Sequence, residues 1–374
     1  MSGNVKVLEL FLSNYRNHRS LKIETEKKVI FISGKNGSGK TNILESISLL
    51  TTSSGMRNSD LYSLVNKNSK THEFAVILQL KLKKEIRLGI GLLPKENNLK
   101  KIIKVDGKIQ SNNELAKYIK IFWLLPYMYN MFNNTSSERR NFFDSLIFHV
   151  DDSHKKNLLD YQKLQKERLK ILKVFSLSDS QKSWLNTIEK KMSILGVIIC
   201  DSRRQFLKKI NKLSLTNCLT FPEIEVSLDG VIDRCFERKT ASEVEKIIIK
   251  KLSENRKIDS VIGRTQFGIN KTDLNVYIKN KDMFVNNCST GEQKITLVTI
   301  IFLFLMLLKD KNVLNIIFLL DDLFAHLDAI YVKILLDELI KLNIQTWITD
   351  VSCNYLTKDF KYFDQTLFLN INDM

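Results

Sequence analysis

The sequence predicts an α/β fold in which a long helical insert separates two lobes of one α/β domain, which we call the head. Alternating apolar and polar residues, which are typical of strands, recur through residues 1–120 on both sides of a Gly-rich turn and a helix. Helical spacing begins near residue 121, and strand-like segments return near residue 265. We therefore expect an N-terminal head lobe over residues 1–120, a helical lid or arm over 121–265 and a C-terminal head lobe over 266–374.

The N-terminal lobe is expected to contain a parallel core sheet and an antiparallel subdomain. The segments VKVLELFL and LKIETEKKVIFISG read as strands that lead into a buried strand over residues 29–33. A Gly-rich turn then precedes an amphipathic helix over residues 42–50. Three more strand-like segments follow, EFAVILQLKL, EIRLGIGLL and KIIKVDGKI, the last with a hairpin turn at Asp106 and Gly107.

The helical insert is predicted from apolar residues spaced by three and four. They indicate one long helix, interrupted on its apolar face only by Ser202: Trp184, Ile188, Met192, Leu195, Ile199, Phe206, Ile210 and Leu213. A second amphipathic segment over residues 155–174 is expected to pair with it antiparallel. After residue 265 we expect strands at FGI and DLNVYIK, an apolar helix after NCSTGEQK, a buried strand over 315–320, a helix over 329–342 and a strand at TWIT.

The composition fits a globular protein without a membrane segment. The 374 residues are 44% hydrophobic and carry a formal net charge of +17, which suits a polyanionic partner or reflects a composition bias. The five cysteines include no C-x-x-C pair, so neither a zinc site nor a disulfide framework is predicted. No charged-then-apolar leader opens the chain, and the longest apolar run, over residues 295–308, is shorter than the ~20 residues of a membrane span. We expect a cytoplasmic protein.

A phosphate-binding loop is the strongest local signal. The segment SGKNGSGKTN fits the pattern G-x-x-x-x-G-K-[ST] between a predicted strand and a predicted helix. Backbone N–H groups of such a loop surround phosphates, the lysine reaches the terminal phosphates and the hydroxyl of the last residue binds Mg²⁺. The residues expected to form this site are Gly34, Lys35, Asn36, Gly37, Ser38, Gly39, Lys40 and Thr41.

Two consecutive acids supply the expected partner of that loop. The buried strand in NIIFLLDD ends at Asp321 and Asp322. A carboxylate at the end of a neighbouring buried strand holds Mg²⁺ in P-loop proteins, although an acid there can also simply begin a solvated loop. We expect Asp321 to bind the metal through water, together with Thr41. Asp322 is expected to orient or polarise the attacking water, and Asp328 to lie in a loop near the phosphates.

The segment NCSTGEQK allows two interpretations. Ser289 or Thr290 followed by Glu292 suits an ordinary helix cap. The same residues also combine a hydroxyl group, backbone N–H groups and the positive end of a helix, which could hold an anion. The local chemistry leaves both interpretations open.

The order of these motifs resembles the ABC-type ATPases of the SMC kind. In those proteins a Ser-Gly loop contacts the γ-phosphate of ATP held by the P-loop of a second protomer. The resemblance implies that Ser289, Gly291 and Glu292 make this contact across a dimer. Within that group the chain is similar to the RecF family of bacterial recombination mediators. The similar segments are LELFLSNYRNH, GKNGSGKTNILESI, WLLPYMYNMFNNTSSERRNFFDSLIF, IIFLLDDLFAHLD and QTWIT.

The resemblance implies a DNA repair function. We expect an ATP- and Mg²⁺-dependent homodimer that holds duplex or gapped DNA without sequence specificity, hydrolyses ATP slowly and is stimulated by DNA. Lys40 and Asp322 would be the catalytic residues, and Arg16 in the first motif would contact the nucleotide. RecR and RecO would be the protein partners in replication restart and recombinational repair, and no membrane would be involved.

Three positions depart from the family pattern. Gly268-Ile269-Asn270-Lys271 replaces G-P-H-[KR], Tyr127 stands after Pro126 where the family has an acid or amide, and Ser54 replaces an arginine. Two other classes share part of the motif set, namely the ATPase subunit of a membrane transporter and a P-loop kinase for a small substrate. Thr349 at the position of the transporter's switch His, the long insert and the STGEQ segment favour the RecF-like interpretation.

Overall fold

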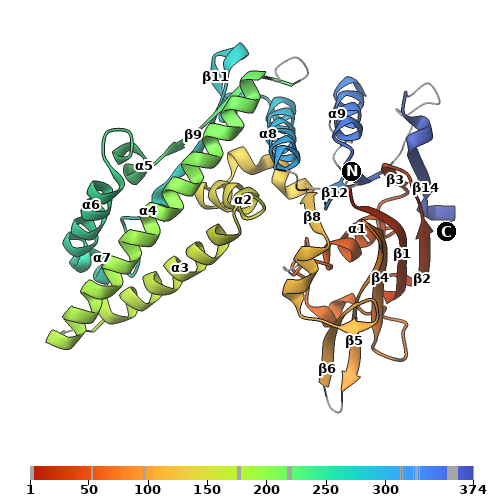
Figure 1. Cartoon of the computed structure of the whole chain (residues 1–374), viewed down its shortest axis with the longest axis horizontal. Helices are drawn as coiled ribbons and strands as arrows, with labels where there is room; N and C mark the ends of the chain where they lie inside the picture. The colour runs from red at the N-terminus through yellow and green to blue at the C-terminus, as the bar shows by residue number, and fades with distance from the viewer. Residues whose placement is uncertain are drawn as a thin grey trace. The chain divides into compact units, whose positions relative to one another are not determined.

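The protein divides into two compact units (Figure 1). The computed structural model describes residues 4–51, 54–95, 98–174, 178–216, 221–311, 313, 315–322, 324, 327, 329–351 and 361–373. The head unit comprises Met1–Tyr129 and Leu308–Met374, and the arm unit comprises Asn130–Leu307. The head unit is therefore assembled from the two ends of the chain.

The head unit contains an antiparallel sheet with the strand order β2-β1-β4-β5-β6-β7. Its strands are β1 (Lys6–Tyr15), β2 (His18–Glu24), β4 (Phe74–Lys81), β5 (Glu85–Lys95), β6 (Asn98–Val105) and β7 (Lys108–Ile109). The expected hairpin turn between β6 and β7 is confirmed. Asp106 and Gly107 have φ angles of 47° and 80°, the left-handed pair that a two-residue hairpin turn requires.

A parallel sheet forms the core of the head unit, with the strand order β14-β3-β13-β12-β8. The strands are β3 (Val29–Ser33), β8 (Lys120–Leu124), β12 (Ile316–Asp321), β13 (Gln345–Asp350) and β14 (Thr366–Asn370), and the helices of this unit are α1 (Lys40–Ser48) and α9 (Ala329–Leu342). Helix α1 places Ile43 and Leu44 in one apolar core with residues of both sheets. All residues of β12 are buried, which explains its nearly uninterrupted apolar sequence.

The arm unit is mainly helical. Helices α3 and α4 lie side by side as a long hairpin (Figure 1). The helices are α2 (Ser136–Phe148), α3 (Asp152–Leu172), α4 (Asp179–Thr216), α5 (Val231–Cys235), α6 (Ala241–Glu254), α7 (Arg256–Ile262) and α8 (Thr290–Asp310), the last of which ends in the head unit. The predicted long helix and its partner are thus confirmed. The arm unit also contains a small antiparallel sheet with the strand order β11-β10-β9. Its strands are β9 (Ile224–Asp229), β10 (Asp273–Ile278) and β11 (Met283–Phe284).

Several expected boundaries differ from the structure. Strands β8 and β9 fall in or at the edge of the region expected to be helical. The segment FGI, expected to be a strand, is not one, because residues 269–271 form a 3-10 turn. Residues 121–129 belong to the head unit and residues 266–307 to the arm unit, since β8 pairs with β12 and β10 pairs with β9.

Helix α8 meets the length and composition of a membrane span within the described residues. Its 21 residues include few charges, but 72% of its most apolar window is buried inside the structure. That degree of burial is also found in the core helix of a soluble protein. Phe302 and Phe304 illustrate the burial, because their rings contact Phe221 and Phe206 of the arm unit.

Candidate nucleotide-binding site

The P-loop connects β3 to α1 at the carboxyl edge of the parallel sheet. Gly37 and Gly39 have φ angles of 81° and 102°, which L-residues rarely adopt. A Cβ atom on Gly39 would lie only 2.3 Å from Asn17 Nδ2. The Ser38 hydroxyl is buried and has no hydrogen-bond partner within the described part of the chain. A shaped loop with a free buried hydroxyl at a helix N-terminus fits a bound phosphate.

Lys40 lies inside this loop. Its Nζ donates hydrogen bonds to Gly34 O at 2.7 Å and to Lys35 O at 3.0 Å, and the side chain is buried. Carbonyl oxygens are the only hydrogen-bond partners of this ammonium group among the residues that the structure describes, and a buried cation held in this way would gain from a more negative ligand. The ammonium group expected from the motif therefore lies within the loop, and its contact with a terminal phosphate stays a prediction.

A polar brace supports the loop from the first hairpin of the chain. Asn17 Nδ2 donates to Ser38 O at 2.9 Å, and Asn17 Oδ1 accepts from Asn42 Nδ2 at 2.7 Å. Arg57 Nη1 donates to Asn42 Oδ1 at 3.1 Å. Sequence reasoning missed Asn17 because its partners lie more than 20 residues away in the chain.

Arg16 binds α1 rather than lying free beside the loop. Its Nε and Nη2 donate to the two carboxylate oxygens of Glu45 at 2.9 and 2.7 Å, and Nη2 also donates to Ser59 Oγ at 2.8 Å. Its Nη1 donates to Ser63 O at 3.0 Å. Glu45 is buried, so this bidentate pair fixes the helix that carries Lys40 and Thr41. The nucleotide contact expected for Arg16 stays a prediction.

The candidate magnesium ligands meet at the ends of neighbouring strands. Asp321, the last residue of β12, accepts at Oδ1 from Thr41 Oγ1 at 2.9 Å and from Thr349 Oγ1 at 2.6 Å. Mg²⁺ in phosphate-transfer sites uses one or two protein oxygens together with substrate oxygens and water. Within the described residues no group of three or more His, Cys, Asp and Glu could hold a metal ion. The pair Thr41 and Asp321 fits a site that phosphate oxygens would complete.

Tyr129, which follows β8 in the chain, supports the same end of β12. Its hydroxyl donates to the backbone oxygen of Asp321 at 2.5 Å. Burial raises the pKa of Tyr129 well above its ordinary value, and the negative charges of Asp321, Asp322 and Asp350 raise it further. Tyr129 is therefore a protonated donor. No local sequence signal distinguishes it from its exposed neighbour Tyr127.

Asp322 follows directly, in a left-handed backbone conformation with φ of 48°. Asp is one of the few residues that adopts this conformation at modest cost. Its N–H donates to Thr349 O at 3.1 Å, which ties it to the adjacent strand. Asp328, also expected near the phosphates, lies outside the described residues.

The segment NCSTGEQK forms a helix cap with an open surface. Ser289 accepts at its hydroxyl from Glu292 N at 3.4 Å, and Glu292 Oε2 accepts from Ser289 N and Oγ, both at 2.8 Å. Gln293 anchors the helix start by exchanging hydrogen bonds with Asn133. Ser289 and Thr290 are exposed, and a Cβ on Gly291 would meet no atom within 4 Å. The geometry confirms the capping interpretation and leaves room for an incoming ligand.

The segment that departs from the family pattern packs against α3. A Cβ on Gly268 would lie 2.4 Å from the Tyr161 hydroxyl, and Asn270 Nδ2 donates to Gln165 Oε1 at 2.8 Å. Lys271 follows at the surface near Gln266. Within the arm unit these residues support helices.

The parallel sheet, the P-loop, the paired strand-end acids and the helical arm define the head of an ABC-type P-loop ATPase of the SMC kind. The chain belongs to the RecF family: the profile described as "RecF/RecN/SMC N terminal domain" matches residues 6–364, and curated relatives are RecF proteins. One relative, "DNA replication and repair protein RecF" of Rickettsia typhi, is 33% identical over 92% of this chain and 94% of its own length. The Rickettsia africae protein of the same name is 33% identical over 95% and 98%.

Solved structures show the same fold. A recombination mediator RecF in complex with an ATP analogue matches with a TM-score of 0.80 and 23% identity, covering 96% of this chain and 95% of that one. A RecF–ATP structure matches with a TM-score of 0.76 and 22% identity over 99% and 98% of the two chains. An Smc head domain derived from Pyrococcus furiosus matches with a TM-score of 0.53 and 16% identity over 93% and 90%.

Proposed function

We propose that the protein is an ATP-dependent DNA-binding protein of recombinational repair and replication restart. The observation that carries this proposal is the contact of Thr41 with Asp321 at 2.9 Å beneath a P-loop whose Ser38 hydroxyl is free. RecF relatives over nearly the whole chain support it, as do the related structures of RecF with ATP and an ATP analogue, which belong to the RecFOR pathway. The transporter and kinase alternatives have no comparable support.

The residues suit a triphosphate with Mg²⁺. The loop from Gly34 to Thr41 would hold the phosphates, Lys40 would neutralise the terminal ones, and Thr41 and Asp321 would hold Mg²⁺. Bound ATP would supply the phosphoanhydride bond whose hydrolysis reopens the complex. Asp322 would orient the attacking water, because its constrained backbone follows the metal-binding strand directly. The resemblance to the RecF family implies that the site turns over slowly and is stimulated by DNA.

The exposed Ser289 segment supports an ATP-dependent homodimer. Its cap leaves Gly291 open to the outside, so a phosphate held by a second protomer could meet backbone N–H groups at a helix N-terminus. Two heads joined in this way would hold duplex or gapped DNA, mainly by contacts of Lys and Arg with phosphate, and binding would weaken as salt rises. RecR and RecO are the proposed protein partners.

The test compares wild type with Lys40→Ala. We expect Lys40→Ala to lose ATP binding in calorimetry and to lose ATP-dependent DNA binding and DNA-stimulated turnover, because a terminal phosphate loses its buried cation. Lys83→Ala, an exposed lysine in the turn between β4 and β5, is the matched control and should behave as wild type. Unchanged ATP affinity in Lys40→Ala would contradict the P-loop assignment. If duplex DNA does not stimulate ATP turnover by the wild type, the transporter or kinase alternatives would be favoured.

A further inference from the structure

Helix α7 of the arm unit turns its apolar side chains toward solvent. Ile258, Val261 and Ile262 are 52%, 89% and 52% exposed, whereas Asp259 is fully buried. Val174, next to the end of α3, adds a fourth exposed aliphatic side chain at 43%. The Ser260 hydroxyl donates to Leu172 O at 2.6 Å and brings the two segments together. We call these four aliphatic residues the α7 patch.

The inverted orientation of α7 is imposed by buried polar groups. Arg168 is fully buried in α3 and donates from Nη1 to Asp259 Oδ2 at 2.6 Å, and Asp259 Oδ1 accepts from Gln266 N at 2.8 Å. Arg256 at the start of α7 donates from Nε to Glu189 Oε1 at 3.1 Å. Rotating α7 to bury its apolar residues would break the buried ion pair between Asp259 and Arg168 and leave Glu189, 2.8 Å from Arg168 Nε, as the remaining acid beside that guanidinium group. Breaking a buried ion pair costs several kcal/mol. The apolar face therefore stays outside.

Cations neighbour the residues of the α7 patch in the chain, because Lys173 precedes Val174, Lys257 precedes Ile258 and Arg264 follows Ile262 by two positions. Lys173, Lys257 and Arg264 are exposed, and none of them has an ion pair with another described residue. The only acid of α7, Asp259, is neutralised by Arg168 in the interior. An exposed aliphatic centre with neighbouring cations resembles the core and rim of a protein interface.

We propose that the α7 patch docks an acidic amphipathic segment of a partner protein. Apolar side chains of such a segment would cover Ile258, Val261 and Ile262, and its carboxylates would face Lys173, Lys257 and Arg264. A second copy does not fit, because a symmetric contact would bring two identical sets of cations together. Single-stranded nucleic acid stacks its bases on aromatic rings, and the patch is aliphatic.

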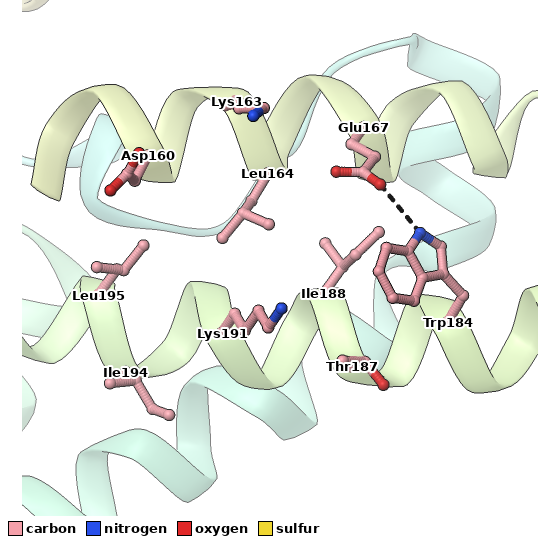
Figure 2. A pocket seen from close by; sticks show the side chains of 10 residues that line it. All are labelled: Asp160, Lys163, Leu164, Glu167, Trp184, Thr187, Ile188, Lys191, Ile194 and Leu195. Carbon is pink, nitrogen blue, oxygen red and sulfur yellow. Dashed lines mark hydrogen bonds between the residues drawn. The ribbon is translucent and has the colours of Figure 1, made fainter. Parts of the chain in front are cut away.

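The groove between α3 and α4 gives no comparable indication of its occupant (Figure 2). It has a volume of about 500 Å³, and Trp184 at one end donates from its indole nitrogen to Glu167 at 3.0 Å. Lysines and carboxylates both line it, among them Lys163, Lys191 and Asp160. Its mixed charge selects neither an acidic nor a basic partner, so the proposal rests on the α7 patch alone.

The proposal is tested with the full chain and a defined probe. The probe is a fluorescein-labelled helical peptide of about 18 residues, with Leu at every third or fourth position and Glu elsewhere. A second peptide carries Lys in place of Glu. Binding is measured by fluorescence anisotropy, with circular dichroism melts to verify folding. Val261→Ser removes the patch, and Leu159→Ser is the matched control, because Leu159 is also exposed but lies about 20 Å along α3 from Leu172.

The expected results separate the apolar contact from the charge. The acidic peptide should bind wild type and Leu159→Ser, lose about tenfold in affinity for Val261→Ser and weaken with salt. The double variant Lys257→Glu and Arg264→Glu should lose the acidic peptide and gain the basic one. Failure of the acidic peptide to bind wild type, equal binding of both peptides, or unchanged binding to Val261→Ser would overturn the proposal. The same holds if Val261→Ser impairs binding of a single-stranded oligonucleotide or of phosphatidylglycerol vesicles instead.

Discussion

Asp144 shows how one motif residue stabilises the arm unit. Arg203 donates from Nε and Nη2 to its two carboxylate oxygens at 2.8 and 2.7 Å, and His154 Nε2 lies 2.9 Å from Oδ1. All three side chains are buried. Burial alone would raise the pKa of Asp144, but the hydrogen bonds from Arg203 and His154 outweigh it and lower the pKa. The acid of the R-R-x-F-F-D segment is thus structural.

The lowered pKa of Asp144 makes stability depend on pH. A carboxyl group with a lower pKa in the folded state stabilises the fold above its unfolded pKa, and this contribution is lost as pH falls below about 4. Asp144→Asn should destabilise the protein by about 3–5 kcal/mol at pH 7, because Arg203 keeps a buried charge without its partner. Urea unfolding at pH 7 and in acid measures both effects, with exposed Asp160→Asn as control. Equal losses for the two variants would refute this role.

At the scale of single residues, functional positions could be predicted where they are consecutive or belong to paired motifs, and contacts between other distant residues could not. The residues of the P-loop are consecutive, and Thr41 with Asp321 follows from paired motifs, so these positions were predicted. Arg168 with Asp259, Arg139 with Asp273 and Asn17 with Ser38 join residues 91, 134 and 21 positions apart. Such pairs depend on the tertiary packing of helices and strands, which no local pattern of one sequence specifies.

Helix α4 is the element on which the separation of head and arm can be tested. We expect Leu195→Pro to break α4 at its centre and to destabilise the arm unit by about 3 kcal/mol or more, because proline removes a hydrogen bond and clashes with the preceding turn. The head unit, which has its own sheets and core, should keep its ATP affinity in calorimetry.

Leu195→Ala is the control, because it shortens the same side chain without breaking the helix. Circular dichroism should show less helix only in the proline variant. A folded Leu195→Pro protein without ATP binding would show that the head depends on the arm.

Helices and strands with a clear apolar pattern in the sequence were predicted better than short strands. The apolar stripe from Trp184 to Leu213 lies within α4, and the buried strand before the P-loop coincides with β3. By contrast, the strands β9 and β11 have only six and two residues. They are strands because they pair with β10, and their own sequences do not indicate this pairing. The inverted helix α7 was missed because its apolar residues face solvent, against the usual rule for amphipathic helices.

At the scale of the whole molecule, the proposed dimer predicts opposite effects of two substitutions. Ser289→Arg places a bulky side chain at the exposed cap and should prevent ATP-dependent dimerisation while leaving ATP binding by each monomer intact. Asp322→Asn should slow hydrolysis and let the ATP-bound dimer accumulate. Light scattering with ATP–Mg²⁺, with ADP and without nucleotide distinguishes these outcomes.

Asn287→Arg, at an exposed position just before the cap, is the control for added charge. Normal dimerisation of the Ser289→Arg variant would show that NCSTGEQK acts only as a helix cap. A wild type that stays monomeric with ATP and DNA would remove the dimer from the proposed function.

The position of β3 between β13 and β14 also determines when the head can form during protein synthesis. Both neighbours of β3 come from the last part of the chain, and the Gln345 side chain bonds to Val7 and Lys27 at the other end. At usual translation rates β3 therefore waits on the order of tens of seconds for its partners. During that time the arm unit leaves the ribosome complete, while an apolar strand of the head stays exposed. Ribosome-bound chains ending before residue 345 should therefore be protease-resistant in the arm and sensitive in the N-terminal segment.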